Sequence, residues 1–252
     1  MERSLIAAQL YTVRDFMKTP ADIAASLKKI KQSGFDAVQV SGFSYEPQEL
    51  AKVLEGEGLV CCATHEGGKD IFEIPEKLVE KLDILNCKYT AYPWPHTNPA
   101  TEEDYLALAK ELDKAGEVFA KAGKVLTYHN HDIEFEKFNG RTGLDIIYSE
   151  TNPKYLQGEI DTCWVQRGGC DPVAWINKLN GRLPLLHLKE YGFYKRQFTL
   201  LEIGNGNLDW KAIIKAGKAA GTEWFIIEQD TCRIDPFESL KIGLDYLVNE
   251  VP

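Results

Sequence analysis

Two histidines stand two positions apart in the stretch LTYHNHDIEF, at His129 and His131, directly after an apolar run. The chain has only five histidines, so this stretch gathers imidazole groups at one point. Because side chains on a strand alternate between its two faces, His129 and His131 are predicted to point the same way. Imidazole binds transition metals and also exchanges protons near neutral pH. The stretch therefore predicts a metal ligand, an acid/base group, or both at the end of a strand.

Three later apolar runs carry ionisable residues with the same two-residue spacing. The pairs are Glu159 and Asp161, His187 and Lys189, and Glu228 and Asp230. The two members of each pair share a face, so four successive strands would direct imidazole, carboxylate and ammonium groups into one interior. Buried charges are costly unless they are paired or bound to a cation. The excess of carboxylates and imidazoles over positive charge favours a divalent ion; mixed ligation of this kind suits Mn²⁺, Co²⁺, Fe²⁺ or Zn²⁺ better than Ca²⁺. The alternative is a salt-bridged polar interior in which Lys189 neutralises its neighbours.

Apolar strand-like runs alternate with amphipathic helical runs along the whole chain. The predicted strands span residues 5–11, 37–43, 59–65, 89–95, 125–131, 156–162, 184–190 and 224–230. The predicted helices span residues 20–34, 47–57, 74–85, 102–122, 142–149, 171–179, 208–220 and 235–248. Thr19 followed by Pro20 is a typical helix start. Glycines such as Gly58 and Gly221 follow helices at the position that favours a left-handed residue.

Eight β–α units in 252 residues predict a closed (β/α)8 TIM barrel that forms a single domain over residues 1–252. An open doubly wound sheet is the competing architecture. It usually has a glycine-rich turn after its first strand, whereas the turn here reads LYTVRDF. In closed barrels the active site lies at the carboxyl ends of the strands, where the paired ionisable residues fall.

The composition argues against several classes of partner. The net charge is −9 and the densest basic run, LKKIKQ, is typical of the exposed side of a helix, so no nucleic-acid partner is expected. No apolar run reaches the ~20 residues needed to cross a bilayer, so no membrane partner is expected either. The six cysteines contain no C-x-x-C pair and are typical of reduced thiols in a cytoplasmic protein. A homodimer is compatible with these features.

The motifs YHNH, GEIDTCWV, GGCDPVAWI, GRLPLLHLKE, EIGNGNLDW and FIIEQD occur in this order along the chain. Together they resemble the xylose isomerase-like TIM-barrel superfamily of sugar phosphate isomerases and epimerases, which is related to inosose dehydratase. This resemblance implies that Asp161, His187 and Glu228 bind one divalent ion (Mn, Co, Fe, Mg or Zn). The fourth ligand of the superfamily is usually a strand-five Glu, and here His129 stands in its place. Trp164 replaces a substrate-binding His of some epimerases, and Asn205 stands where relatives often carry Glu.

The resemblance implies proton abstraction next to a carbonyl of a keto-sugar or cyclitol, which makes this chain a metal-dependent sugar isomerase or epimerase. The alternative is a metal-dependent dehydratase or lyase, and a remote alternative is an endonuclease IV-like or non-catalytic barrel. The expected acid/base residues are Glu228, His131 and Lys189. Expected contacts to the carbohydrate substrate come from His65, Glu66, Trp94, Glu159, Trp164, Lys189 and Gln9. Lys195 and Arg196 lack a glycine-rich anion cradle, so an unphosphorylated substrate is favoured.

Overall fold

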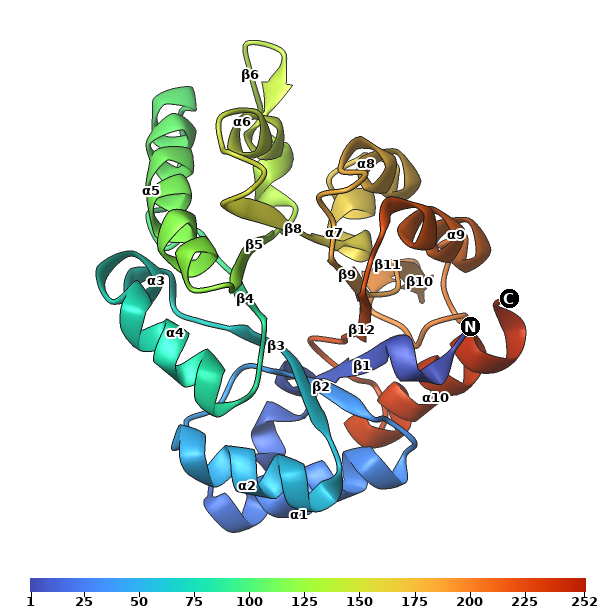
Figure 1. The fold of residues 1–252 in the computed structure, drawn as a ribbon. Helices are drawn as coiled ribbons and strands as arrows, with labels where there is room; N and C mark the ends of the chain where they lie inside the picture. The colour runs from blue at the N-terminus through green and yellow to red at the C-terminus, as the bar shows by residue number, and fades with distance from the viewer.

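Eight parallel strands close into a barrel in the computed structural model, which describes all of residues 1–252 (Figure 1). The strands of the barrel, in chain order, are β1 (Ile6–Gln9), β2 (Ala37–Val40), β3 (Val60–His65), β4 (Tyr89–Tyr92), β5 (Val125–His129), β8 (Leu156–Asp161), β9 (Leu185–Leu188) and β12 (Trp224–Ile227). Each strand pairs with its sequence neighbour, and β1 closes the ring by pairing with β12. The predicted (β/α)8 barrel is confirmed.

Helices form an outer ring around the barrel (Figure 1). They are α1 (Pro20–Gln32), α2 (Pro47–Glu57), α3 (Gly68–Glu73), α4 (Pro75–Ile84), α5 (Glu102–Lys121), α6 (Gly143–Ser149), α7 (Thr162–Arg167), α8 (Pro172–Lys178), α9 (Trp210–Ala220) and α10 (Pro236–Glu250). Thr19 caps α1 as predicted, in a reciprocal hydrogen-bonded box with Asp22. The two helices that were not predicted, α3 and α7, have six residues each, too few to show a clear helical period. None of the helices combines the length and the apolar character needed to cross a membrane.

The strands are shorter than the sequence predicted, and seven of the eight end one to three residues early. After β8 the chain turns at once into α7, because the Asp161 side chain accepts a hydrogen bond from the backbone N–H of Trp164 and caps that helix. The ends of β5, β9 and β12 therefore leave His131, Lys189 and Glu228 just beyond the ladder. These residues stand at the mouth of the barrel.

The apolar core has two parts. The larger part lies between the strands and the helices and includes Tyr128, Ile160 and Ile227, which the strand alternation predicts to face outward. The smaller part lies inside the barrel and consists of Ala7, Ala37, Cys62, Ala63, Tyr89, Leu185 and Ile226. Several of these residues are the first or second of their strands, so apolar side chains fill the amino-terminal end of the barrel. The polar interior residues occupy the opposite half.

The segment 191–210, which the sequence indicated to be a long loop, contains a small hairpin of β10 (Gly192–Tyr194) and β11 (Gln197–Thr199). The Glu190 carboxylate, 1% exposed, fixes the base of this segment. It accepts hydrogen bonds from the backbone N–H groups of Gly204 and Leu208 and from the indole of Trp210. A Cβ on Gly206 would lie 2.5 Å from the Glu190 carboxyl carbon, so glycine is required in the GNG motif.

Candidate functional site

A cavity of about 480 Å³ opens at the carboxyl ends of the barrel strands. Its lining residues are Tyr11, Ser41, His65, Pro93, Trp94, His129, His131, Lys189, Glu228 and Asp230. Catalytic sites of such barrels lie at this end. The cavity is therefore the candidate active site.

Four of the predicted ligands gather at the cavity floor, and we call His129, Asp161, His187 and Glu228 the outer set. One ligand atom from each lies within 4.8 Å of the others, and all four side chains are buried. His187 Nδ1 is 2.9 Å from Glu228 Oε2 and 3.9 Å from Asp161 Oδ2. His129 Nδ1 and Asp161 Oδ2 have no hydrogen-bond partner although both are buried. An imidazole nitrogen and a carboxylate oxygen without partners fit a divalent cation.

Lys189 lies among the carboxylates of the outer set. Its ammonium nitrogen is 3.1 Å from Asp161 Oδ2, 2.9 Å from Glu228 Oε2 and 3.0 Å from Asp230 Oδ1. The contact to Asp161 is ionic, because it lacks hydrogen-bond geometry. Burial opposes the charge of Lys189, but the three carboxylates prevail and raise its pKa well above the usual value. Lys189 is thus charged at neutral pH, as the salt-bridged alternative predicted.

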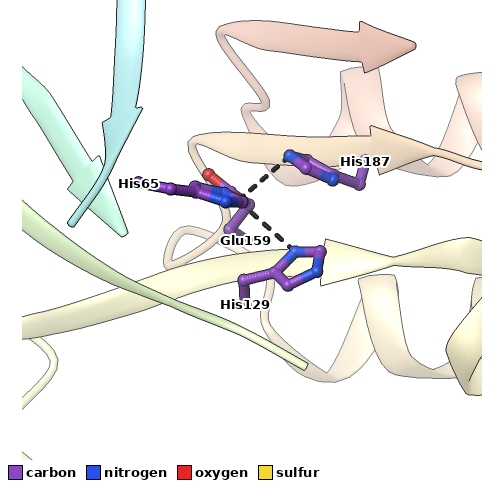
Figure 2. A group of neighbouring side chains, drawn as sticks. All are labelled: His65, His129, Glu159 and His187. Carbon is purple, nitrogen blue, oxygen red and sulfur yellow. Dashed lines mark hydrogen bonds and ion pairs between the residues drawn. The ribbon is translucent and has the colours of Figure 1, made fainter. Parts of the chain in front are cut away.

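His187 contacts a different carboxylate with each of its two ring nitrogens, and Figure 2 shows the contact to Glu159. Nδ1 faces Glu228, whereas Nε2 lies 3.0 Å from Glu159 Oε1 and 2.6 Å from Gln39 Oε1. Burial alone would lower the pKa of His187, but the Glu159 and Glu228 carboxylates raise it to about 10. Without a bound metal, His187 therefore carries a proton at neutral pH. Gln39, a polar residue in the apolar run AVQV, is a contact that the sequence analysis missed.

His131 lines the cavity between two indoles. Its ring centroid is 4.7 Å from that of Trp94 and 5.5 Å from that of Trp164. Burial, with the charges of His129 and Lys189 nearby, lowers the pKa of His131 to about 2. Its Nδ1 atom has no hydrogen-bond partner. At neutral pH this imidazole is uncharged.

Glu134 supports the His131 backbone from below, which the sequence did not reveal. Its carboxylate accepts hydrogen bonds of 2.8 Å from the Tyr128 hydroxyl and from the backbone N–H of His131. The side chain is fully buried, and burial raises the pKa of Glu134 to about 7. The turn after β5 therefore contains a carboxyl group that gains a proton close to neutral pH.

We expect Glu134→Gln to remove a pH-dependent component of stability. With an ordinary unfolded pKa near 4.5 and a folded pKa of about 7, Glu134 stabilises the fold fully below pH 4.5. This contribution, about 3 kcal/mol, is lost as the pH rises through 7. The difference in unfolding free energy between wild type and variant should shrink by about that amount between pH 5 and pH 8. Urea unfolding at both pH values measures it. Glu136→Gln, at an exposed position, is the matched control; a constant difference would contradict the assignment.

Two predicted substrate contacts lie away from the cavity. Glu66 follows the last residue of β3, so it points opposite to His65, and its carboxylate pairs with Lys81 of α4 at 2.9 Å. Gln9 points into the barrel but is fully buried, and its amide donates to Gln39 at 2.7 Å. The expectation that Glu66 and Gln9 touch the substrate is corrected accordingly.

The remaining predicted contacts divide into cavity-lining and supporting residues. His65 and Trp94 line the cavity. Trp164 packs beside it, with its ring 4.9 Å from the Lys189 ammonium. Glu159 lies deeper, fully buried among histidines, and is therefore not a substrate contact in this structure.

Comparison with known proteins relates the chain to sugar-modifying barrels. The model of the family described as xylose isomerase-like TIM barrel matches residues 27–249. An inosose dehydratase of Geobacillus thermodenitrificans is 28% identical over 156 residues, which are 55% of this chain and 52% of that protein. An inosose dehydratase of Lactiplantibacillus plantarum is 23% identical over 264 residues, covering 88% and 86% of the two chains. The chain matches the Geobacillus protein, and two inosose dehydratases of Lacticaseibacillus casei, over only about half of the length of those relatives.

Solved structures give the same relation at the level of the fold. A sugar phosphate isomerase/epimerase from Parabacteroides distasonis superposes with a TM-score of 0.83 at 21% identity, covering 97% of each chain. This likeness shows a common architecture. With the family model matching most of the sequence, the chain belongs to the xylose isomerase-like TIM barrel family.

Proposed function

We propose that this chain is a metal-dependent dehydratase of a keto-sugar or keto-cyclitol, which removes a proton next to the carbonyl and expels a β-hydroxyl as water. The observation that carries the proposal is the unlike pair in the cavity lining, the imidazole of His131 and the ammonium of Lys189. Elimination needs one group that accepts a proton and another that donates one. The similarity to inosose dehydratases supports the same reaction class.

The outer set would hold the cation beside the substrate. When bound, a divalent ion supplies Lewis-acid stabilisation of negative charge on the substrate's carbonyl oxygen. His131 takes the proton from the carbon next to the carbonyl and becomes an imidazolium. Lys189 gives a proton to the β-hydroxyl, which leaves as water while the carbon–carbon double bond forms. Transfer of the proton from His131 back to Lys189 through solvent restores both groups.

The cavity indicates an uncharged polyol. Lys189 is the only lysine or arginine in its lining, and three carboxylates already surround its ammonium. A phosphate group would therefore find no free cation there. Trp94, 46% exposed at the rim, offers an indole face for a sugar ring, and Ser41 and His65 offer hydrogen-bonding groups for hydroxyls.

Epimerisation or isomerisation is the second candidate, because it begins with the same proton abstraction and ends with reprotonation of the carbon. Glu228 favours epimerisation or isomerisation, because its carboxylate also lines the cavity and is a second group that can accept or donate a proton. The two reactions differ in whether water is lost.

Incubation in D₂O separates the candidates. Protein loaded with Mn²⁺ or Co²⁺ is mixed with a panel of keto-sugars and inososes, and the products are followed by ultraviolet absorbance and mass spectrometry. Dehydration is expected to give an enone absorbance with the loss of one water. Deuterium incorporation without loss of water would replace dehydration by epimerisation, and no change across the panel would reject both. Chelator-treated protein is the control.

A further inference from the structure

A second group of candidate ligands shares two residues with the outer set (Figure 2). We call His65, His129, Glu159 and His187 the inner set; their ligand atoms also lie within 4.8 Å of one another. Three imidazole nitrogens surround a single carboxylate oxygen, Glu159 Oε1. The distances to it are 2.5 Å from His65 Nε2, 3.4 Å from His129 Nδ1 and 3.0 Å from His187 Nε2.

The inner carboxylate has histidines, and no lysine or arginine, as its ion-pair partners. Glu159 is fully buried, and no lysine or arginine lies within ion-pair distance of it; its other oxygen accepts a hydrogen bond from the Gln39 amide. In the outer set, by contrast, the Lys189 ammonium already pairs with Asp161 and Glu228. A buried carboxylate needs a counter-charge. Histidines bind a metal in their neutral form, so a cation in the inner set would take over the counter-charge that these imidazoles provide to Glu159.

The geometry of the inner set also suits a small ion. Ligand atoms about 2.0 Å from a tetrahedral Zn²⁺ are separated by about 3.3 Å. His129 Nδ1 and His187 Nε2 lie 3.4 and 3.0 Å from Glu159 Oε1, close to this separation, whereas the 2.5 Å contact of His65 Nε2 lengthens when an ion binds. His129 Nδ1 is buried without a hydrogen-bond partner and lies next to this oxygen. His187 turns a different nitrogen toward each set, Nε2 inward and Nδ1 outward. His65 and His129 line the cavity, which provides a path of entry from solvent.

We propose that the inner set is a cation site of its own, with three imidazole ligands and one carboxylate, and that it holds Zn²⁺ in the substrate-free protein. Nitrogen-rich tetrahedral ligation favours Zn²⁺ over Mg²⁺ or Mn²⁺. The two sets share His129 and His187, so one ion per chain is expected. The outer set remains the one next to the substrate cavity, and the inner site stands whether or not a sugar is turned over.

X-ray absorption spectroscopy of wild-type protein with one equivalent of Zn²⁺ and no substrate tests this proposal directly. Three imidazoles in the first coordination shell are expected for the inner set. Two imidazoles would place the ion in the outer set and overturn the proposal, as would a failure of wild-type protein to bind Zn²⁺. Neither result depends on turnover, which the D₂O experiment measures separately.

Paired variants provide a second test. His65→Asn and Glu159→Gln change only the inner set, and each is expected to weaken Zn²⁺ binding at least about tenfold in competition with a chromophoric chelator. Asp161→Asn changes only the outer set and should alter the affinity less than about threefold. The reverse pattern would overturn the inner site. Circular dichroism verifies that each variant is folded; should an inner variant not fold, the absorption experiment on wild type decides.

Discussion

His131→Asn is expected to lower kcat for dehydration by about 10²–10⁴-fold, the range in which a positioned general base contributes to catalysis. The substitution removes the proton-accepting nitrogen at the cavity wall and leaves a polar side chain between Trp94 and Trp164. Because His131 belongs to neither ligand set, metal content should stay at the wild-type level. Steady-state kinetics with the substrate found in the D₂O panel, together with elemental analysis, measures both quantities.

His96→Asn is the matched control for this variant. His96 is exposed, bonds to the Tyr92 hydroxyl at 2.8 Å and does not line the cavity. Its replacement should leave kcat within about threefold of wild type, since no reacting group changes. Equal losses in the two variants would remove His131 from its role as the base.

Lys189→Met is expected to destabilise the metal-free protein by about 3–5 kcal/mol, because removing one partner of a buried ion-pair network leaves the other charges unpaired. The carboxylates of Asp161, Glu228 and Asp230 would lose their shared counter-ion, and Lys189 is only 1% exposed. A divalent ion in the outer set can replace the lost charge. Added metal should therefore raise the unfolding free energy of the variant by more than that of wild type.

Guanidinium unfolding with and without a chelator measures both effects. Lys88→Met is the matched control, because Lys88 pairs with a single carboxylate, Glu223, and both side chains are exposed. It should cost about 1 kcal/mol or less, in the range of surface ion pairs. Two results would contradict the role of Lys189 as the shared counter-ion of the three carboxylates. One is a Lys189 variant as stable as the control, and the other is a variant that added metal stabilises no more than it stabilises wild type.

The sequence was sufficient for the barrel because its signals are local. Each apolar run and each amphipathic helix can be recognised from a window of about a dozen residues. Eight repeats of this strand–helix pattern are compatible with very few architectures. The two-residue spacing also indicated which ionisable side chains face the interior, since alternation on a strand is a property of the backbone. The family resemblance then selected the outer set from among them. His129, Asp161, His187 and Glu228 do converge, although they come from four different strands.

The inner set was not predictable from the same spacing. Which rows of side chains meet inside a barrel depends on the register between strands, which places His129 beside Glu159 and Asp161 beside His187. The assignments of Gln9 and Glu66 failed for related reasons. The Gln9 amide is hydrogen-bonded to Gln39 on the neighbouring strand. Glu66 lies one residue past the end of β3, where it forms an ion pair with Lys81.

The hydrogen bonds of Glu190 make the β10–β11 hairpin structurally independent of the barrel. The Glu190 carboxylate binds the chain where it returns at Gly204 and Leu208, so the hairpin between Glu190 and Gly204 contributes little to closing the barrel. A different hairpin could be grafted between residues 192 and 199 while the catalytic floor keeps its position. Loop libraries at this hairpin would vary the surface that follows β9 without first rebuilding the scaffold.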